Sequence, residues 1–190
     1  MEISNRQLEE RLSASKQEIN DLQENLEAVR TESLTDPLTQ SANRKFFDIT
    51  LEKAIAEALE TNEAMSLMLT DIDHFKTFND NFGHLTGDQV LRLVAMSVKH
   101  NVKGKDTTAR EFAVILLNTI LRAAVTVAEH IRRAVMAKEL MKRSTGEHLG
   151  RMTISIGVAT LRKGDTGQSL IERADTCLYA AKRHGRNRVI

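Results

Sequence analysis

The sequence contains few of the residues that cross-link, kink or anchor a chain. Its 190 residues include one cysteine, Cys177, one proline, Pro37, one tyrosine and no tryptophan. A single cysteine excludes an intramolecular disulfide and any multi-cysteine metal site, as is usual in a reducing compartment. No apolar run approaches the ~20 residues of a membrane span, and the first residues do not resemble a signal peptide. We therefore expect a soluble, cytoplasmic protein.

The charges are nearly balanced, with 27 basic and 26 acidic residues. Such a balance gives no general attraction to nucleic acid or to a membrane surface. The hydrophobic fraction of 41% is enough for a buried core. The length suits one ordinary domain with an accessory segment.

The accessory segment is N-terminal. Between residues 5 and 33 a heptad can be written with these apolar positions: Leu8, Leu12, Ile19, Leu22, Leu26 and Val29. Strict spacing over about four heptads favours a coiled coil and a parallel dimer. The alternative is a single amphipathic helix packed on its own domain, but the apolar stripe is narrow for that. We predict a coiled-coil stalk over residues 1–33, ended by Asp36-Pro37, and a domain over residues 34–190.

The most informative stretch of that domain is residues 67–88. The apolar run at residues 67–69 predicts a buried strand, which ends on Asp71-Ile72-Asp73. We interpret the next residues as a polar loop, and Thr86 with Gln89 as a capping box that starts a helix at Gly87.

Polar side chains gather in that loop, namely Lys76, Asn79, His84 and Asp88. Carboxylates at the end of a strand, facing such groups, suit Mg²⁺ and phosphate. The simpler interpretation is a charged loop that leaves a strand. An EF-hand is disfavoured because Lys76 stands at the sixth loop position, where a glycine is required.

Apolar periodicity predicts the remaining elements. We expect a helix at 44–60 with Leu59 in its core face, a helix after residue 86, a strand at 112–117, a helix at 123–142, a basic loop at 142–150, a half-buried strand at 152–158 and a last helix at 170–181 ended by His184-Gly185. The mixture of helices and strands predicts an α+β fold.

Several blocks of the chain resemble the GGDEF domain, the catalytic domain of diguanylate cyclases. They are DIDHFKTFNDNFGHLTGDQVL (71–91), LTDPLTQSANRKFFD (34–48), EFAVILLNT (111–119), TISIGVAT (153–160) and ADTCLYAAKRHGRNRV (174–189). Ordered blocks of this kind are far more specific than one short motif. The resemblance implies a palm like that of nucleotidyl cyclases: a mainly antiparallel central sheet flanked by helices, with the element order βααββαβα.

The resemblance also implies a reaction and a set of ligands. Two GTP molecules, one in each of two facing domains, are joined into cyclic di-GMP with loss of pyrophosphate, so the protein is expected to act as a homodimer. Two Mg²⁺ ions per site are expected, held by the Asp71 carboxylate, the backbone carbonyl of Ile72 and an acid of the signature turn. In the family the stalk commonly relays a signal from an upstream sensor or receiver domain.

Substrate contacts follow from the same blocks. Asn79 and Asp88 match the residues that read guanine, while Lys76, Lys182 and Arg186 match the triphosphate contacts. For Lys182 and Arg186 the alternative is that cations merely favour a helix C-terminus, worth ~0.3–1 kcal/mol.

The chain departs from the family at the signature turn itself. The family pattern is an arginine, one residue, then Gly-Gly-(Asp/Glu)-Glu-Phe, whereas here Arg110 is followed directly by Glu111 and Phe112. Glu111 matches the second acid of the motif and is the remaining candidate catalytic residue. Hairpin turns need residues that accept a positive φ, so we expect the strands to unpair near the tip or the turn to be strained. Without the glycines and the metal-binding acid, turnover should be poor or absent.

Three interpretations stay open. The first is an active cyclase, in which the four residues are present in the protein but missing from the sequence as written. The second is a degenerate domain that binds nucleotide without chemistry, and the third is a dimerisation module with a vestigial pocket. The presence of so many ligand-binding residues together argues against the third.

The family's product-inhibition site, Arg-x-x-Asp, corresponds here to Lys103-Gly104-Lys105-Asp106. Lysine keeps the charge of arginine but lacks the planar fork that contacts guanine and phosphate. We predict that feedback by cyclic di-GMP is weak or absent. Calorimetric titration with cyclic di-GMP should show no micromolar site, and such a site would contradict the prediction.

Overall fold

The computed structural model describes residues 16–19, 34, 36, 38–39, 41, 43–102, 107–108, 112–141 and 146–190. The chain divides into two compact units, Met1–Thr35 and Asp36–Ile190. In the first unit residues 16–19 are helical. Most of the predicted coiled coil lies outside the described residues, so the stalk and its boundary stay predictions.

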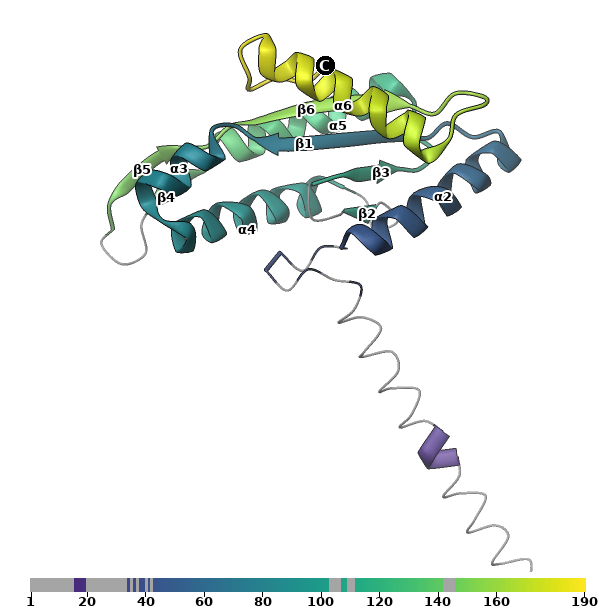
Figure 1. The fold of residues 1–190 in the computed structure, drawn as a ribbon, viewed down its shortest axis with the longest axis horizontal. Helices are drawn as coiled ribbons and strands as arrows, with labels where there is room; N and C mark the ends of the chain where they lie inside the picture. The colour runs from purple at the N-terminus through teal and green to yellow at the C-terminus, as the bar shows by residue number, and fades with distance from the viewer. Residues whose placement is uncertain are drawn as a thin grey trace, which may run out of the picture. The chain divides into compact units, whose positions relative to one another are not determined.

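The second unit alternates helices with short strands. In chain order they are α2 (Arg44–Thr61), β1 (Ser66–Ile72), α3 (Phe75–Phe82), α4 (His84–Asn101), β2 (Thr107–Thr108), β3 (Val114–Leu116), α5 (Leu121–Met136), β4 (Glu139–Met141), β5 (His148–Arg151), β6 (Ile154–Thr160) and α6 (Gly167–Arg183) (Figure 1). From β1 onward the predicted order is confirmed, apart from the added hairpin β4–β5.

Within the described residues the central sheet has the strand order β2-β3-β1-β6, and each neighbouring pair is antiparallel. The longest ladder joins β1 to β6, from Ser66↔Thr160 to Ile72↔Ile154. Strands β4 and β5 form a separate antiparallel pair. The α+β class with an antiparallel sheet, predicted from the sequence, is therefore confirmed.

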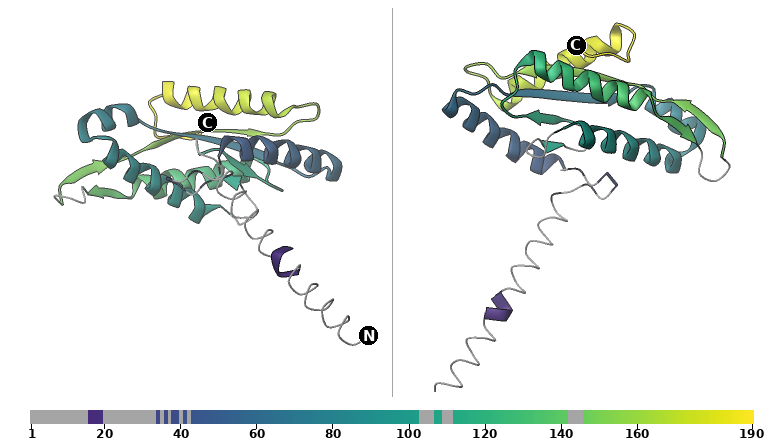
Figure 2. Two further views of the ribbon diagram at one scale, coloured as in Figure 1. Left: turned by 60° about the horizontal axis from the view of Figure 1, so that its bottom comes forward. Right: turned by 180° about the vertical axis from the view of Figure 1, so that it is seen from behind.

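Helices cover both faces of this sheet (Figure 2). One core cluster joins α4 and α5 to side chains such as Met68 and Ile156, and the other joins α2 and α6 to side chains such as Leu67 and Ala159. Because successive side chains of a strand point to opposite faces, β1, β3 and β6 contribute to both clusters. None of the described helices is long and apolar enough to cross a membrane.

Strand β6 is buried on both faces, with only Thr160 half-buried. The prediction of a half-buried strand was therefore wrong. It rested on the alternation of Thr153, Ser155 and Gly157 with apolar residues, but α6 covers that second face, where Gly157 lies against the helix backbone.

Helix α6 begins with a complete capping box, in which Thr166 and Ser169 bond to each other's backbone N–H groups. The preceding Asp165 pairs with Arg173. Burial raises the pKa of Asp165, but the N–H of Arg162, the Ser169 hydroxyl and the Arg173 guanidinium together hold that pKa below its ordinary value. The start of α6 thus carries an ionised carboxylate at neutral pH.

The region between β1 and α4 differs from its prediction. A helix, α3, replaces most of the expected loop, and α4 begins at His84 rather than at Gly87. Thr86 lies inside α4 and donates to the carbonyl of Phe82. The break between the helices is Gly83, whose φ of +81° costs little only for glycine. The rings of Phe78 and Phe82, 4.9 Å apart, give α3 an apolar face.

Two further boundaries and one predicted core residue were wrong. Helix α5 ends at Met136, and the hairpin β4–β5 occupies part of the expected helix end and loop. Strand β3 is shorter than residues 112–117. Leu59 is 47% exposed, and Ala58 takes the core position instead.

We predict that Gly157→Ala destabilises the fold, because the added methyl group would overlap the carbonyl oxygen of Ala174 and the amide nitrogen of Leu178. Forcing an atom into a packed core costs about 1–3 kcal/mol, and urea unfolding should show such a loss. Thr176→Ala, on the exposed side of α6, is the matched control and should stay within about 0.5 kcal/mol of wild type. An equal stability for Gly157→Ala would contradict the packing described here.

Candidate functional site

A cavity of about 600 Å³ opens where β1 ends. Its lining comes from β1, the start of α3, Leu91 of α4, Phe112 and the C-terminal part of α6 with the turn that follows. The predicted site residues that line it are Asp71, Ile72, Lys76, Lys182 and Arg186. The structure thus gathers the predicted metal ligands and the predicted phosphate contacts at one place.

Asp71 faces this cavity. Its side chain is 48% exposed and its carboxylate lies 3.0 Å from the Nζ atom of Lys182, which is 33% exposed. The pair joins β1 to α6 across the cavity wall. A half-exposed ion pair of this kind contributes little to stability, so both groups are available to a ligand.

Asp73, two residues later, has the opposite environment. It is 4% exposed, and its carboxylate accepts hydrogen bonds from the Thr153 hydroxyl (2.7 Å), the Ser155 hydroxyl (2.7 Å) and the backbone amide of Asn187 (3.0 Å). Three donors satisfy a buried carboxylate inside the protein. Asp71 is therefore the carboxylate free to act on a ligand, while Asp73 is structural.

The sequence pattern grouped Asp73 with Asp71 as carboxylates suited to Mg²⁺ and phosphate, whereas the structure gives Asp73 three donors from the protein. The signal present in the sequence is the pair of hydroxyl residues, Thr153 and Ser155, at the start of a strand. Their side chains could be expected to bond to a buried acid only once β6 was known to lie beside β1.

The described residues contain no group of three or more histidine, cysteine or acidic side chains able to hold a metal ion. Asp73 is engaged by its three donors, so Asp71 and the carbonyl of Ile72 are the predicted ligands that remain. Carboxylate ligands on both ions are what a two-metal centre requires. The described donors therefore do not fit a two-metal centre, in agreement with the missing acid of the signature turn.

Asn79 and Asp88 do not line the cavity. They lie on α3 and α4, and Asn79 packs so closely on Gly87 that any side chain at residue 87 would overlap its amide. The buried Oδ1 atom of Asn79 has no hydrogen-bond partner among the described residues. Since buried polar atoms are normally bonded, this amide is a candidate for a ligand contact beside Asp88.

The signature turn is only partly described. Glu111, Lys103 and Asp106 lie outside the described residues, so their predicted roles stay predictions. The described pairing of β2 with β3 ends at Thr108↔Val114. Phe112 is buried with a φ of +53°, a conformation that strains a bulky residue. The turn residues themselves lie outside the described residues, so the expectation that the strands unpair near the tip or that the turn is strained stays a prediction.

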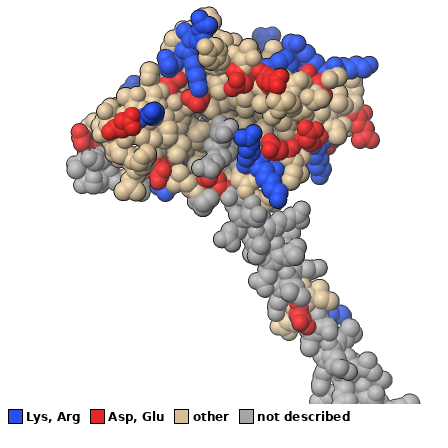
Figure 3. All heavy atoms as spheres, in the orientation of Figure 1, with Lys and Arg blue, Asp and Glu red and all other residues tan. Residues whose placement is uncertain are grey.

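The face of the molecule drawn in Figure 3 carries acidic and basic side chains in small interspersed groups. This distribution matches the formal net charge of +1.

Comparison with known proteins identifies the class. Residues 33–188 match the family described as "Diguanylate cyclase, GGDEF domain", and the chain belongs to the GGDEF family. This confirms the resemblance seen in the sequence.

Individual relatives agree. The chain is 39% identical over 187 residues to diguanylate cyclase VdcA of Vibrio cholerae, covering 96% of this chain and 54% of that protein. It is 39% identical over 174 residues to the response regulator PleD of Caulobacter vibrioides, covering 89% of this chain and 38% of that protein. The chain thus spans about half or less of the length of these curated relatives.

Among solved structures, the coiled coil and GGDEF domain of DgcB from Caulobacter crescentus, in complex with c-di-GMP, superposes with a TM-score of 0.90 at 46% identity. The match covers 96% of this chain and 97% of that one. Diguanylate cyclase SiaD of Pseudomonas aeruginosa, solved with its activator SiaC, gives a TM-score of 0.80 at 31% identity, over 97% and 72% of the two chains.

We predict that the two aspartates differ in their contribution to stability. Asp71→Ala should change the free energy of unfolding by less than about 1 kcal/mol, as for exposed ion pairs. Asp73→Ala leaves two hydroxyls and an amide without their acceptor and should cost about 2–4 kcal/mol. Urea unfolding of both variants tests this, and equal losses would contradict the assignment.

Proposed function

We propose that this chain is a diguanylate cyclase-family domain that binds GTP in the cavity at the end of β1 and turns it over poorly or not at all. The observation that carries the proposal is the convergence of Lys76, Lys182 and Arg186 with Asp71 on one cavity. Three cations beside a half-exposed carboxylate suit a triphosphate with its own Mg²⁺.

Guanine recognition is assigned to Asn79 and Asp88. A carboxylate can accept from the N–H groups of guanine, and an amide can donate to its acceptors. The Oδ1 atom of Asn79 is the acceptor of this amide and has no partner among the described residues, so it is available to an N–H group of guanine, which supports the assignment. The base then lies along α3 and α4, and the phosphates reach the cavity.

Lys182 serves two roles in this proposal. Without nucleotide it pairs with Asp71 at 3.0 Å. When a triphosphate enters, Lys182 contacts the phosphate oxygens instead. The Asp71 carboxylate is then free to bind the Mg²⁺ of the nucleotide. The pair thus neutralises the charge of Asp71 before the ligand binds.

Turnover is limited by the signature turn. Cyclic di-GMP forms when the 3′-hydroxyl of each GTP attacks the α-phosphorus of the other and pyrophosphate leaves. The missing acid removes charge stabilisation at that phosphorus, and the missing glycines remove the close approach of backbone to nucleotide. Glu111, next to the buried and strained Phe112, is a poor substitute.

We also propose that the protein is a cytoplasmic homodimer joined by the coiled-coil stalk. The reaction needs two facing domains, and the similar DgcB structure contains a coiled coil with its GGDEF domain. An upstream sensor or receiver domain would control such a stalk. An active cyclase that carries the four residues is the second candidate, favoured by the similarity to named diguanylate cyclases.

Calorimetric titration tests nucleotide binding. With Mg²⁺ present we expect GTP to bind, ATP to bind at least about tenfold more weakly, and Lys182→Ala to weaken GTP about tenfold, as for a hydrogen bond to a charged group. Lys163→Ala, in the turn before α6, is the control and should bind GTP like wild type. Equal affinities for GTP and ATP, or no binding, would contradict the proposal.

Reinsertion of the turn tests the cause of poor turnover. Insertion of four residues before Glu111, ending Gly-Gly-Glu, should raise cyclic di-GMP formation by at least about a hundredfold, since metal-held charge supplies several kcal/mol. The matched control is the same four-residue insertion ending Gly-Gly-Gln, because it restores the backbone without the acid. Equal rates for the two insertions would show that the missing acid is not the cause.

A further inference from the structure

The turn after α6 holds a strained backbone. Arg186 has a φ of +60° and Asn187 a φ of +46°, so two consecutive residues with side chains are left-handed. This conformation is uncommon for residues with side chains, more so for arginine than for asparagine. Contacts of the neighbouring elements must therefore hold this turn.

The first anchor is Asp73. Its Oδ2 atom accepts a hydrogen bond of 3.0 Å from the amide of Asn187 and another of 2.7 Å from the Thr153 hydroxyl. The amide of Asp73 donates to the carbonyl of Thr153 at 2.9 Å. One buried carboxylate thus joins the end of β1, the start of β6 and the turn after α6.

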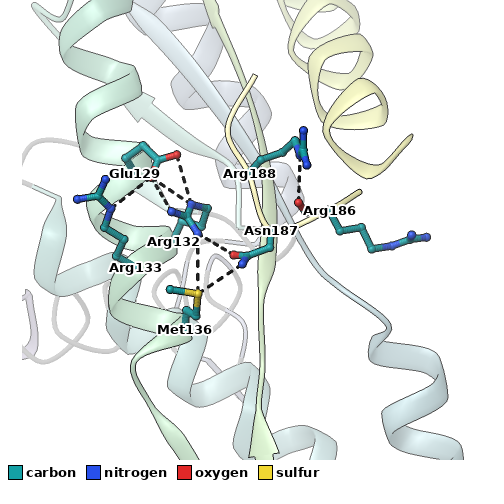
Figure 4. A network of polar contacts seen from close by, with 7 residues as sticks. All are labelled: Glu129, Arg132, Arg133, Met136, Arg186, Asn187 and Arg188. Carbon is teal, nitrogen blue, oxygen red and sulfur yellow. Dashed lines mark hydrogen bonds and ion pairs between the residues drawn. The ribbon is translucent and has the colours of Figure 1, made fainter. Parts of the chain in front are cut away.

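The second anchor comes from α5. Arg132, whose side chain is 14% exposed, donates to the Oδ1 atom of Asn187 at 2.8 Å and is held by Glu129. The side-chain nitrogen of Asn187, Nδ2, lies 3.4 Å from the sulfur of Met136. Figure 4 shows Asn187 pointing toward these α5 residues, while the Arg186 side chain points the other way.

The chain beyond the turn is also fixed. The backbone amides of Ile156 and Val158 donate to the carbonyls of Arg188 and Ile190, respectively. The backbone amide of Ile190 donates to the carbonyl of Ile156. The side chain of Arg186 is exposed and lines the cavity, while the backbone on both sides of it is held by hydrogen bonds.

We propose that Asp73 and Asn187 are positioning residues that hold Arg186 in the conformation that meets the phosphates of the nucleotide. The inference rests on the proposed GTP site. Asp73 does not touch the ligand; it fixes the turn from which Arg186 reaches the cavity. Because it also ends the β1–β6 ladder beside Asp71, it sets the distance between the free carboxylate and this phosphate contact.

A double-mutant cycle tests the proposal, with GTP affinity read by calorimetry and guanosine affinity by NMR titration. We expect Arg186→Ala and Asp73→Ala each to weaken GTP about five- to tenfold, as for a lost bond to a charged group, with less than twofold change for guanosine. The double variant should match Arg186→Ala, because Asp73 acts only through that residue. Asp73→Asn, which keeps an acceptor toward the Asn187 amide, should stay close to wild type.

A loss that affects GTP and guanosine equally, or a loss that adds fully to that of Arg186→Ala, would overturn the proposal. Should Asp73→Ala fail to fold, Arg132→Met removes the second anchor from outside the cavity and should weaken GTP selectively by about threefold. Arg133→Met is its control, since Arg133 is 68% exposed and contacts Glu129 rather than Asn187. Wild-type protein that binds no GTP would instead refute the proposed function, and this inference with it.

Discussion

The arrangement of the site depends on the antiparallel ladder between β1 and β6 and on the buried carboxylate that ends it. The ladder runs to Ile72↔Ile154, and Asp73 then bonds to Thr153, Ser155 and Asn187. A buried carboxylate with three donors has a strict geometry, because loss of any bond leaves a polar group in an apolar core. This single group fixes the strand that carries Asp71 relative to the turn that carries Arg186.

The second constraint is the close approach of α6 to β6 at Gly157, where the absence of a side chain lets the helix backbone touch the strand. That contact brings Lys182 within 3.0 Å of Asp71. The proposed phosphate contact Lys182 and the proposed metal ligand Asp71 therefore lie on packed elements. By contrast, the described part of the hairpin β2–β3 has two paired residues on each strand and ends near a strained Phe112.

Much of this could be predicted from the sequence. The apolar stripes gave α2, α4 and α6 within a few residues, and the motif blocks grouped Asp71, Lys76, Lys182 and Arg186, which line one cavity of the structure. The errors have physical causes. Helix α3 was missed because its polar residues resemble a loop and its apolar face is only two phenylalanines wide.

The burial of β6 and the role of Asp73 depend on contacts between residues far apart in the sequence. Thr153, Ser155 and Asn187 reveal nothing until the chain folds back, and Gly157 resembles an ordinary strand residue until α6 lies on it. A pattern within one segment cannot encode these contacts. At the signature turn, by contrast, the sequence alone shows that four residues of the family pattern are missing. The structure adds that the described pairing of β2 with β3 is short and that Phe112 is strained.

The central claim is that the fold and nucleotide site are retained while the chemistry is lost with the signature turn. The most direct test is cyclic di-GMP formation from GTP and Mg²⁺ by purified protein whose intact mass matches the 190 residues. We expect no product above background from protein of that mass, under conditions in which it binds GTP. Turnover at the rate of an ordinary cyclase by protein of that mass would contradict the account.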